Sequence, residues 1–391
     1  MALFVVSAPP SLQAQRLRDD DYARVSQRGH DQLFRLEYDE AIQFFTELER
    51  RYPEHPGPPI SRSIAIWLRE LFTREDLDLD RFISPGHFTR PPEQEMDPAR
   101  RKAFFEGVFR TRELASRYLE SHPRDNDARY YMATSESAMG VFAYTIDRSF
   151  KDALQHGRRA YLMQLEIVED DPGFNDAYLT LGTYEYVAGN LPWYIKWLAT
   201  MAGYGGSEAR GFDYIVRAAQ KGPYVGDDAR TLLMVLYVRE GQYAYALEMA
   251  RQMHARYPEN FILHLNQAQI LERMGRDAEA ATVYAAVASR AEAKSANYQM
   301  MDLAALRYRL GAKLLELGDR EKALAQFYLA ASDPETTERD RALSHLRAGE
   351  ILDTLGARDE AISHYQAVRQ LQEVEGSHET AGKYLANPFH D

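Results

Sequence analysis

The 391-residue sequence contains no cysteine, which excludes disulfide bonds, thiolate nucleophiles and cysteine-based zinc sites. Basic residues are fewer than acidic ones: the chain has 47 Lys and Arg and 59 Asp and Glu, for a formal net charge of −12. Because a phosphate backbone must be met by clustered Lys and Arg, this balance argues against a nucleic-acid partner. No apolar run approaches the ~20 residues of a membrane-spanning helix, and the best stretch is only 232–238.

The rest of the composition is that of a globular protein, with 45% hydrophobic and 27% charged residues. At ~150 residues per domain, the length favours two or three domains. The first fifteen residues differ from the rest of the chain. A short apolar run (2–6), small residues and Ala14 precede the first charge at Arg16, as in the second half of a secretory signal peptide.

We therefore expect residues 1–15 to be a truncated signal peptide, with the mature chain beginning near Gln15 or Arg16 and located in the periplasm or envelope. The basic first region of such a peptide is missing. The alternative is a frayed N-terminus on a cytoplasmic protein.

An internal repeat dominates the C-terminal half. Four segments each carry a glycine and, five positions later, an alanine, and the alanines follow one another at steps of 34, 43 and 38 residues. Glycine ends a helix cheaply in the left-handed conformation, and alanine permits a close helix crossing. The four pairs are Gly241/Ala246, Gly275/Ala280, Gly318/Ala323 and Gly356/Ala361.

An aromatic residue follows the alanine by four positions in three of the repeats, as Tyr284, Phe327 and Tyr365, with Ala250 as the exception. This pattern over about 222–371 resembles the tetratricopeptide-repeat (TPR) family, whose unit is a 34-residue helix–turn–helix. The resemblance implies an all-α solenoid, a right-handed superhelix of about seven helix pairs. At the early aromatic position of each first helix, the sequence instead has Arg230, His264, Arg307 and His345.

Weaker copies lie upstream. Residues 36–56 resemble a second helix, with Ala41 and Phe45 at its small and aromatic positions, while 127–140 with 149–166, and 175–186 with 207–222, resemble helix pairs. Residues 60–72 and 98–121 are expected to form a degenerate pair. The arrangement also resembles a group of largely uncharacterised bacterial envelope TPR proteins, and distantly the outer-mitochondrial-membrane repeat proteins of lipid-droplet inclusion clearance.

These patterns predict a signal-like segment and three helical regions with a tail. The boundaries are 1–15, degenerate pairs at 16–123, central pairs at 124–221 with an aromatic insert at 189–206, repeats at 222–376, and a tail at 377–391. In the insert, Pro192 suits a first helical turn, and Trp193 and Trp197 would share one face. Such a short apolar helix must be buried, either in its own groove or against a partner or membrane interface.

No motif for catalysis or cofactor binding is present, so we expect a non-enzyme with no cofactor and no metal site. Asp76-x-Asp78-x-Asp80 imitates a calcium loop, but Arg81 and His87 stand where Gly and Glu are required, which favours a solvated acidic loop. The eleven histidines show no metal-binding spacing. The stretch before Ser207 continues to Glu208 rather than to a phosphate-binding Lys, so Ser207 is interpreted as a helix N-cap.

The TPR resemblance implies a concave groove lined by the first helices of each pair, and each groove position has the alternative of being a plain solvent-facing residue. The groove positions are Tyr131, Ser135, Thr183, Tyr186, Val235, Arg239, Leu265, Gln269, Arg273, Tyr308, Leu346, Glu350 and Asp353, and the insert contacts are Trp193, Tyr194 and Trp197. The favoured function is a non-enzymatic scaffold of the bacterial envelope that holds a protein or peptide in this groove. The alternative is a lipid- or small-ligand-contacting factor that uses the insert at 190–204.

Overall fold

The helical prediction is confirmed. The computed structural model describes residues 17, 20–84, 86–92, 94–191, 201 and 205–390, and none of these lies in a β-strand. They form two compact units. The first takes the chain up to Leu77 and Arg81–Leu233, and the second takes Asp78–Asp80 and Met234 onward. The signal-like segment 1–15 and the insert residues Trp193, Tyr194 and Trp197 lie outside the described residues.

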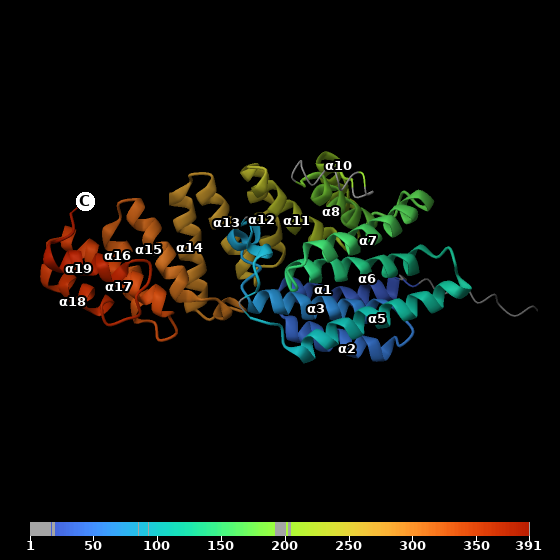
Figure 1. Ribbon diagram of the computed structural model, residues 1–391, viewed down its shortest axis with the longest axis horizontal. Coiled ribbons are helices and arrows are strands. Elements are labelled where there is room, and N and C mark those ends of the chain that lie inside the picture. The colour runs from blue at the N-terminus through green and yellow to red at the C-terminus, as the bar shows by residue number, and fades with distance from the viewer. Residues whose placement is uncertain are drawn as a thin grey trace, which may run out of the picture. The chain divides into compact units, whose positions relative to one another are not determined.

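Helices of the first unit pack against their neighbours in the sequence, as Figure 1 shows from blue to green. The stretches expected at 60–72 and 98–121 are helices that pack on each other, as predicted. In chain order the elements are α1 (Asp20–Phe34), α2 (Tyr38–Arg51), α3 (Gly57–Thr73), α4 (Leu79–Ile83), η1 (His87–Thr89), α5 (Pro98–Ser121), α6 (Asn126–Thr145), α7 (Phe150–Asp170), α8 (Ala177–Gly189), α10 (Glu208–Lys221) and α11 (Gly226–Arg239). The division between the units falls within α4 and within α11.

The second unit continues in the same way, from yellow to red in Figure 1. Helix α13 packs on α14, α15 packs on α16 and α17 packs on α18, and α19 packs on α18 at the end. The elements after α11 are α12 (Tyr243–Arg256), α13 (Phe261–Arg273), α14 (Asp277–Glu292), η2 (Tyr298–Met300), α15 (Leu303–Glu316), α16 (Arg320–Ser332), α17 (Glu338–Thr354), α18 (Arg358–Val368) and α19 (Ser377–Ala386).

The four repeat glycines end their helices as expected. Gly241, Gly275, Gly318 and Gly356 have φ between +69° and +81°. In each case the next residue's N–H bonds back five residues, at 2.8–2.9 Å, to a carbonyl in the last turn of the helix, which is the Schellman arrangement. The turn between α1 and α2 has the same geometry at Leu36, with φ +68° and a bond from Glu37 N–H to the Gln32 carbonyl.

The small and aromatic positions form the core between the paired helices. The alanines at 246, 280, 323 and 361 are 0% exposed, as are Tyr284, Phe327 and Tyr365. Two of these rings lie against glycines on the preceding first helix, at Gly311 and Gly349. A Cβ atom built on Gly349 would stand 2.5 Å from Cε1 of Tyr365, so glycine makes room for the ring.

Replacing Gly349 with alanine is therefore expected to lower the free energy of unfolding by about 1 kcal/mol, because overpacking outweighs the gain in helix propensity. Gly382 in α19 is the matched control, since a Cβ there meets nothing within 4 Å. Gly382→Ala should stabilise by ~0.5–1 kcal/mol. Denaturant unfolding followed by circular dichroism measures both, and a Gly349→Ala protein as stable as Gly382→Ala would contradict this account of the ring packing.

Candidate functional site

Three side chains from two successive repeats converge on one carboxylate in the second unit. Gln269 and Arg273 lie one turn apart on α13, and Arg309 comes from α15. Arg273 and Arg309 donate to different oxygens of Asp80, each at 2.7 Å, and Gln269 Nε2 donates to Asp80 at 3.2 Å and to Asp78 at 2.9 Å. These three side chains bind carboxylates. Because two of them are arginines, we call Gln269, Arg273 and Arg309 the α13–α15 cation site.

The electrostatics of this site favour a bound anion. Burial opposes the charged form of Asp80, but hydrogen bonds and positive charge from Arg309 and then Arg273 outweigh it and lower the pKa of this carboxyl. Behind Arg309, Glu272 accepts from its guanidinium at 2.9 Å and from the Tyr284 hydroxyl at 3.0 Å. The second helix of the repeat thus anchors the ion pair, and the arginine is held in place for an acidic ligand.

The expectation that Asp76, Asp78 and Asp80 form a solvated acidic loop is wrong. Asp76 is 2% exposed and, within the first unit, pairs with Arg148 at 2.9 Å and with His87 at 2.6 Å. Asp78 and Asp80 belong to the second unit and bind the cation site. Local sequence could not reveal this, because the partners of Asp80 lie up to 229 residues away.

Groove positions predicted in the first unit are mostly buried. Tyr131 packs edge-on against His55, and Ser135 accepts a hydrogen bond from Arg112 at 2.8 Å beside the buried Glu136. Tyr186 on α8 is 2% exposed, and Thr183 is half-buried with its hydroxyl donating to the Leu179 carbonyl. These contacts place the four side chains within the packing of the unit, and their groove role stays a prediction.

The nine positions predicted in the second unit have different surroundings. Gln269 and Arg273 meet in the cation site, whereas Leu346, Glu350 and Asp353 on α17 are taken up by packing. The carboxylate of Asp353 receives bonds from Arg358, from the Tyr365 hydroxyl and from the Phe389 N–H. Of the remainder, Val235 is buried, Leu265 and Tyr308 are half-buried, and Arg239 is exposed. Arg309 was not among the predicted positions, although it follows Tyr308 directly.

His264 and Arg307 stand where the first helix of a TPR unit usually has an early aromatic residue. Both pack against neighbouring side chains. His264 on α13 stacks on His254 of α12 with ring centroids 4.2 Å apart, and Tyr298 hydroxyl lies 2.9 Å from its Nδ1. Arg307 is shielded beside Glu292 and Asp333. Two stacked imidazole rings would repel each other if both were protonated, so the stacking disfavours a positive charge on both histidines.

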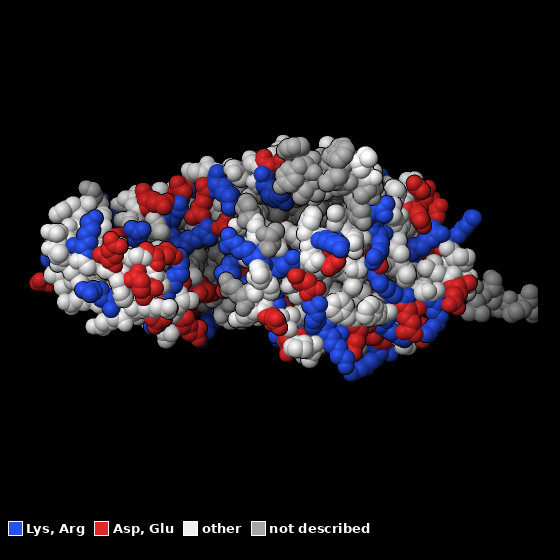
Figure 2. Space-filling model, viewed as in Figure 1, with Lys and Arg blue, Asp and Glu red and all other residues white. Residues whose placement is uncertain are grey.

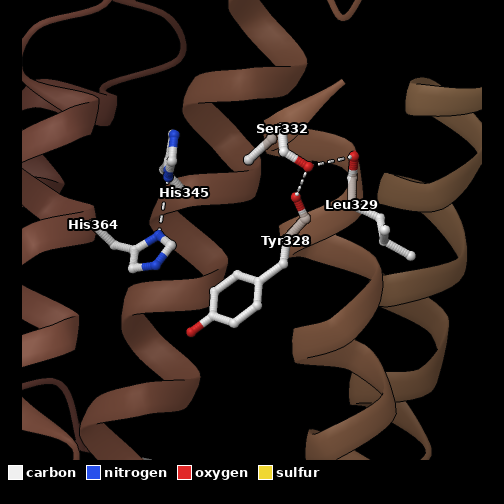
Figure 3. A pocket seen from close by; sticks show the side chains of 6 residues that line it. Tyr328, Leu329, Ser332, His345 and His364 are labelled. Carbon is white, nitrogen blue, oxygen red and sulfur yellow. Dashed lines mark hydrogen bonds between the residues drawn. The ribbon is translucent and has the colours of Figure 1, made fainter. Parts of the chain in front are cut away.

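A further histidine pair borders a pocket of about 320 Å³ among α16, α17 and α18. Figure 3 shows His345 and His364 facing each other beside Tyr328, with Nδ1 atoms 2.9 Å apart. Tyr328 stacks on His364 with centroids 5.1 Å apart. One ring must donate and the other accept, so this arrangement requires at least one neutral imidazole.

Acid is therefore expected to weaken the second unit through these histidines. The pKa of His264 is lowered to about 3, mainly by burial and to a smaller extent by the positive charges of His254 and Arg290. The pKa of His345 is lowered to about 4, again mainly by burial and to a smaller extent by His364 and Arg341. Both lie below the ordinary 6.5, so the unfolded chain takes up protons first as pH falls. The stabilisation is complete above about pH 6.5 and declines toward the folded-state values.

His264→Gln should give a shallower fall in unfolding free energy between pH 7 and pH 4.5, because one of these proton-linked contributions is removed. Denaturant titrations at several pH values measure the slope. Carboxylates contribute equally to both proteins, so an unchanged slope in the variant would contradict the role of His264.

Charges of both signs are interspersed over the face shown in Figure 2. Among the described residues, no helix is both long enough and apolar enough to cross a membrane. The same part of the chain holds no cluster of three His, Asp or Glu side chains that would bind a metal ion. Met201, close to the insert's tryptophans in sequence, is 75% exposed.

No protein-family model matches the chain, and no curated protein matches it. Among solved structures, the human IFIT1 dimer with PPP-AAAA aligns at 16% identity and TM-score 0.35 over 94% of this chain and 85% of that one. The same dimer with m7Gppp-AAAA aligns at 15% and 0.38 over the same shares, and yeast Tom70 at 12% and 0.33 over 94% and 95%. These identities and TM-scores are too low to assign the ligands or partners of those proteins to this chain. Its function must be inferred from its own residues. Within each unit, those residues form an all-α, TPR-like array of helices packed in consecutive pairs.

Proposed function

We propose that the protein is a non-enzymatic scaffold that binds a protein or peptide on the first-helix face of its TPR-like repeats, in the bacterial cell envelope. The observation that carries the binding proposal is the α13–α15 cation site. There, side chains from two repeats hold the carboxylates of a short segment that is remote in sequence. The same donors suit an incoming peptide, because guanidinium groups pair strongly with carboxylates.

A buried polar cluster around Glu185 in the first unit is explained by helix packing and needs no catalytic role. Glu185 is 1% exposed and is held by Arg210, by the Tyr161 hydroxyl and by the Ser207 N–H, each at 2.8 Å. Ser207 also caps α10, as the sequence predicted. The two oxygens of Glu185 thus tie α8 to Tyr161 on α7 and to the start of α10, which is the expected chemistry of a packing contact.

The binding proposal is tested by affinity capture from an envelope extract, with the wild type compared with Arg273→Ala/Arg309→Ala. Proteins that depend on the groove should be captured by the wild type and lost in the variant. Lys102→Ala/Lys151→Ala removes two exposed cations from the first unit and serves as the control. If no captured protein distinguishes the two arginines from the two lysines, this face is not the binding site.

The envelope location is proposed from the pattern of residues 1–15, and N-terminal sequencing of the fractionated native protein tests it.

The lipid- or small-ligand alternative rests on Trp193, Tyr194 and Trp197. Sedimentation with phosphatidylethanolamine/phosphatidylglycerol vesicles separates it from the main proposal. Binding that disappears in Trp193→Ala/Trp197→Ala but persists in the arginine variant would favour the alternative.

A further inference from the structure

The segment Asp78–Asp80 sits on the cation site in the manner of a bound peptide. It belongs to the second unit although no other residue before Met234 does. Its two carboxylates share the amide nitrogen of Gln269, and Leu79 between them is 2% exposed. The contacts are those of an Asp-x-Asp ligand: two acidic side chains bound and the middle side chain buried.

The site has more hydrogen-bonding capacity than this segment uses. Gln269 is 2% exposed and Asn266, almost one turn earlier on α13, is 4% exposed. The side-chain carbonyl oxygens of both are buried without a hydrogen-bond partner among the described residues. Unsatisfied buried acceptors cost free energy. Backbone N–H groups of a longer peptide running along α13 would satisfy them.

The arrangement of donors distinguishes carboxylates from a single larger anion. Arg273 and Arg309 each give one nitrogen to a separate oxygen of Asp80, and Gln269 bridges to the second carboxylate on Asp78. Asn266, Gln269 and Arg273 follow one another along one side of α13, so the amides precede the cation. This order fits a peptide whose backbone lies over the amides and whose acidic side chains reach the arginines.

We propose that Asp78–Asp80 is an internal ligand of the α13–α15 cation site, which an acidic Asp-x-Asp segment of a partner protein displaces. The inference rests on the proposed function and adds the partner's chemistry and a built-in competitor. A tethered ligand acts at an effective concentration on the order of mM. The wild-type protein therefore binds an external acidic peptide more weakly than a protein whose own segment has been neutralised.

The test uses a fluorescein-labelled peptide that copies residues 75–82, titrated with the full-length protein and followed by fluorescence anisotropy. Asp78→Asn/Asp80→Asn should bind this peptide at least tenfold more tightly than the wild type. Adding Arg273→Ala/Arg309→Ala should abolish binding. A peptide with Asn at the two positions that copy Asp78 and Asp80 should not bind either. Glu335→Gln/Glu360→Gln removes the same charge from exposed positions of the second unit and should match the wild type.

Equal affinities of the wild type and Asp78→Asn/Asp80→Asn would overturn the proposal, as would tight binding that survives loss of both arginines. Hydrogen exchange on the wild type gives an independent answer if the double variant fails to fold. Saturating peptide should speed exchange of the amides at 78–83, and unchanged exchange would equally overturn it. Captured proteins that depend on the arginines, together with equal peptide affinities, would leave the scaffold function standing and remove only the internal ligand.

Discussion

Replacing Asp353 with alanine is expected to lower the free energy of unfolding of the second unit by about 3 kcal/mol. The Asp353 side chain is 1% exposed and accepts two bonds from Arg358 at 3.0 Å, one from the Tyr365 hydroxyl at 2.9 Å and one from the Phe389 N–H at 2.8 Å. Without it, a buried hydroxyl and a largely shielded guanidinium lose their acceptor. Arg358 is 28% exposed and keeps the carbonyls of Tyr384 and Leu385, which limits the loss.

The loss should be local to the C-terminal end of the unit, because Arg358 and Phe389 join α18 to the segment after α19 through this carboxylate. Hydrogen exchange of α18 and α19, with circular dichroism during denaturant unfolding, measures it. Tryptophan fluorescence would not serve, since Trp67, Trp193 and Trp197 all precede the second unit's main segment. Glu335→Ala, at an exposed carboxylate, should change stability by no more than about 0.5 kcal/mol. If Asp353→Ala changes stability as little as Glu335→Ala does, the hydrogen bonds of Asp353 do not hold the C-terminal helices together.

Replacing Ala280 with leucine is expected to cost ~1–3 kcal/mol, because three carbon atoms would be forced into a closed helix contact. Ala280 is 0% exposed and lies on α14, one turn before the buried Tyr284. Ala286→Leu on the exposed side of the same helix is the control and should be close to neutral. Thermal unfolding by circular dichroism compares the two. An Ala280→Leu protein that melts with the wild type would disprove the repeat register derived from the Gly/Ala spacing.

How much of the fold was predictable is clear from particular turns. Gly241, Gly275, Gly318 and Gly356 marked their turns in the sequence because only glycine adopts positive φ without cost. Leu36 adopts the same turn with φ +68°, and no sequence signal revealed it. Its side chain is 5% exposed, so burial compensates for backbone strain. Local preference predicts a turn only where tertiary contacts do not override it.

The candidate site was predictable in part. The TPR resemblance implied Gln269 and Arg273 as groove positions on a first helix. The structure places both on the carboxylate of Asp80, and their role in binding a partner stays a prediction. Their ligand was missed, and so was Arg309. Asp80 looked like one of three equivalent loop aspartates, because the sequence around it says nothing about α13 or α15.

The sequence by itself determined the helical repeat, its register and the residues that close the core. These depend on side-chain volume and backbone preference, which are properties of each residue and its near neighbours. Only the tertiary structure decided the roles of the charged residues. Asp353 became a packing anchor, Asp80 an occupant of the cation site, and His264 a neutral stacked ring. The physical reason is that the free energy of a charge depends on solvent exposure and on partners brought near by folding, and those partners lie on other helices.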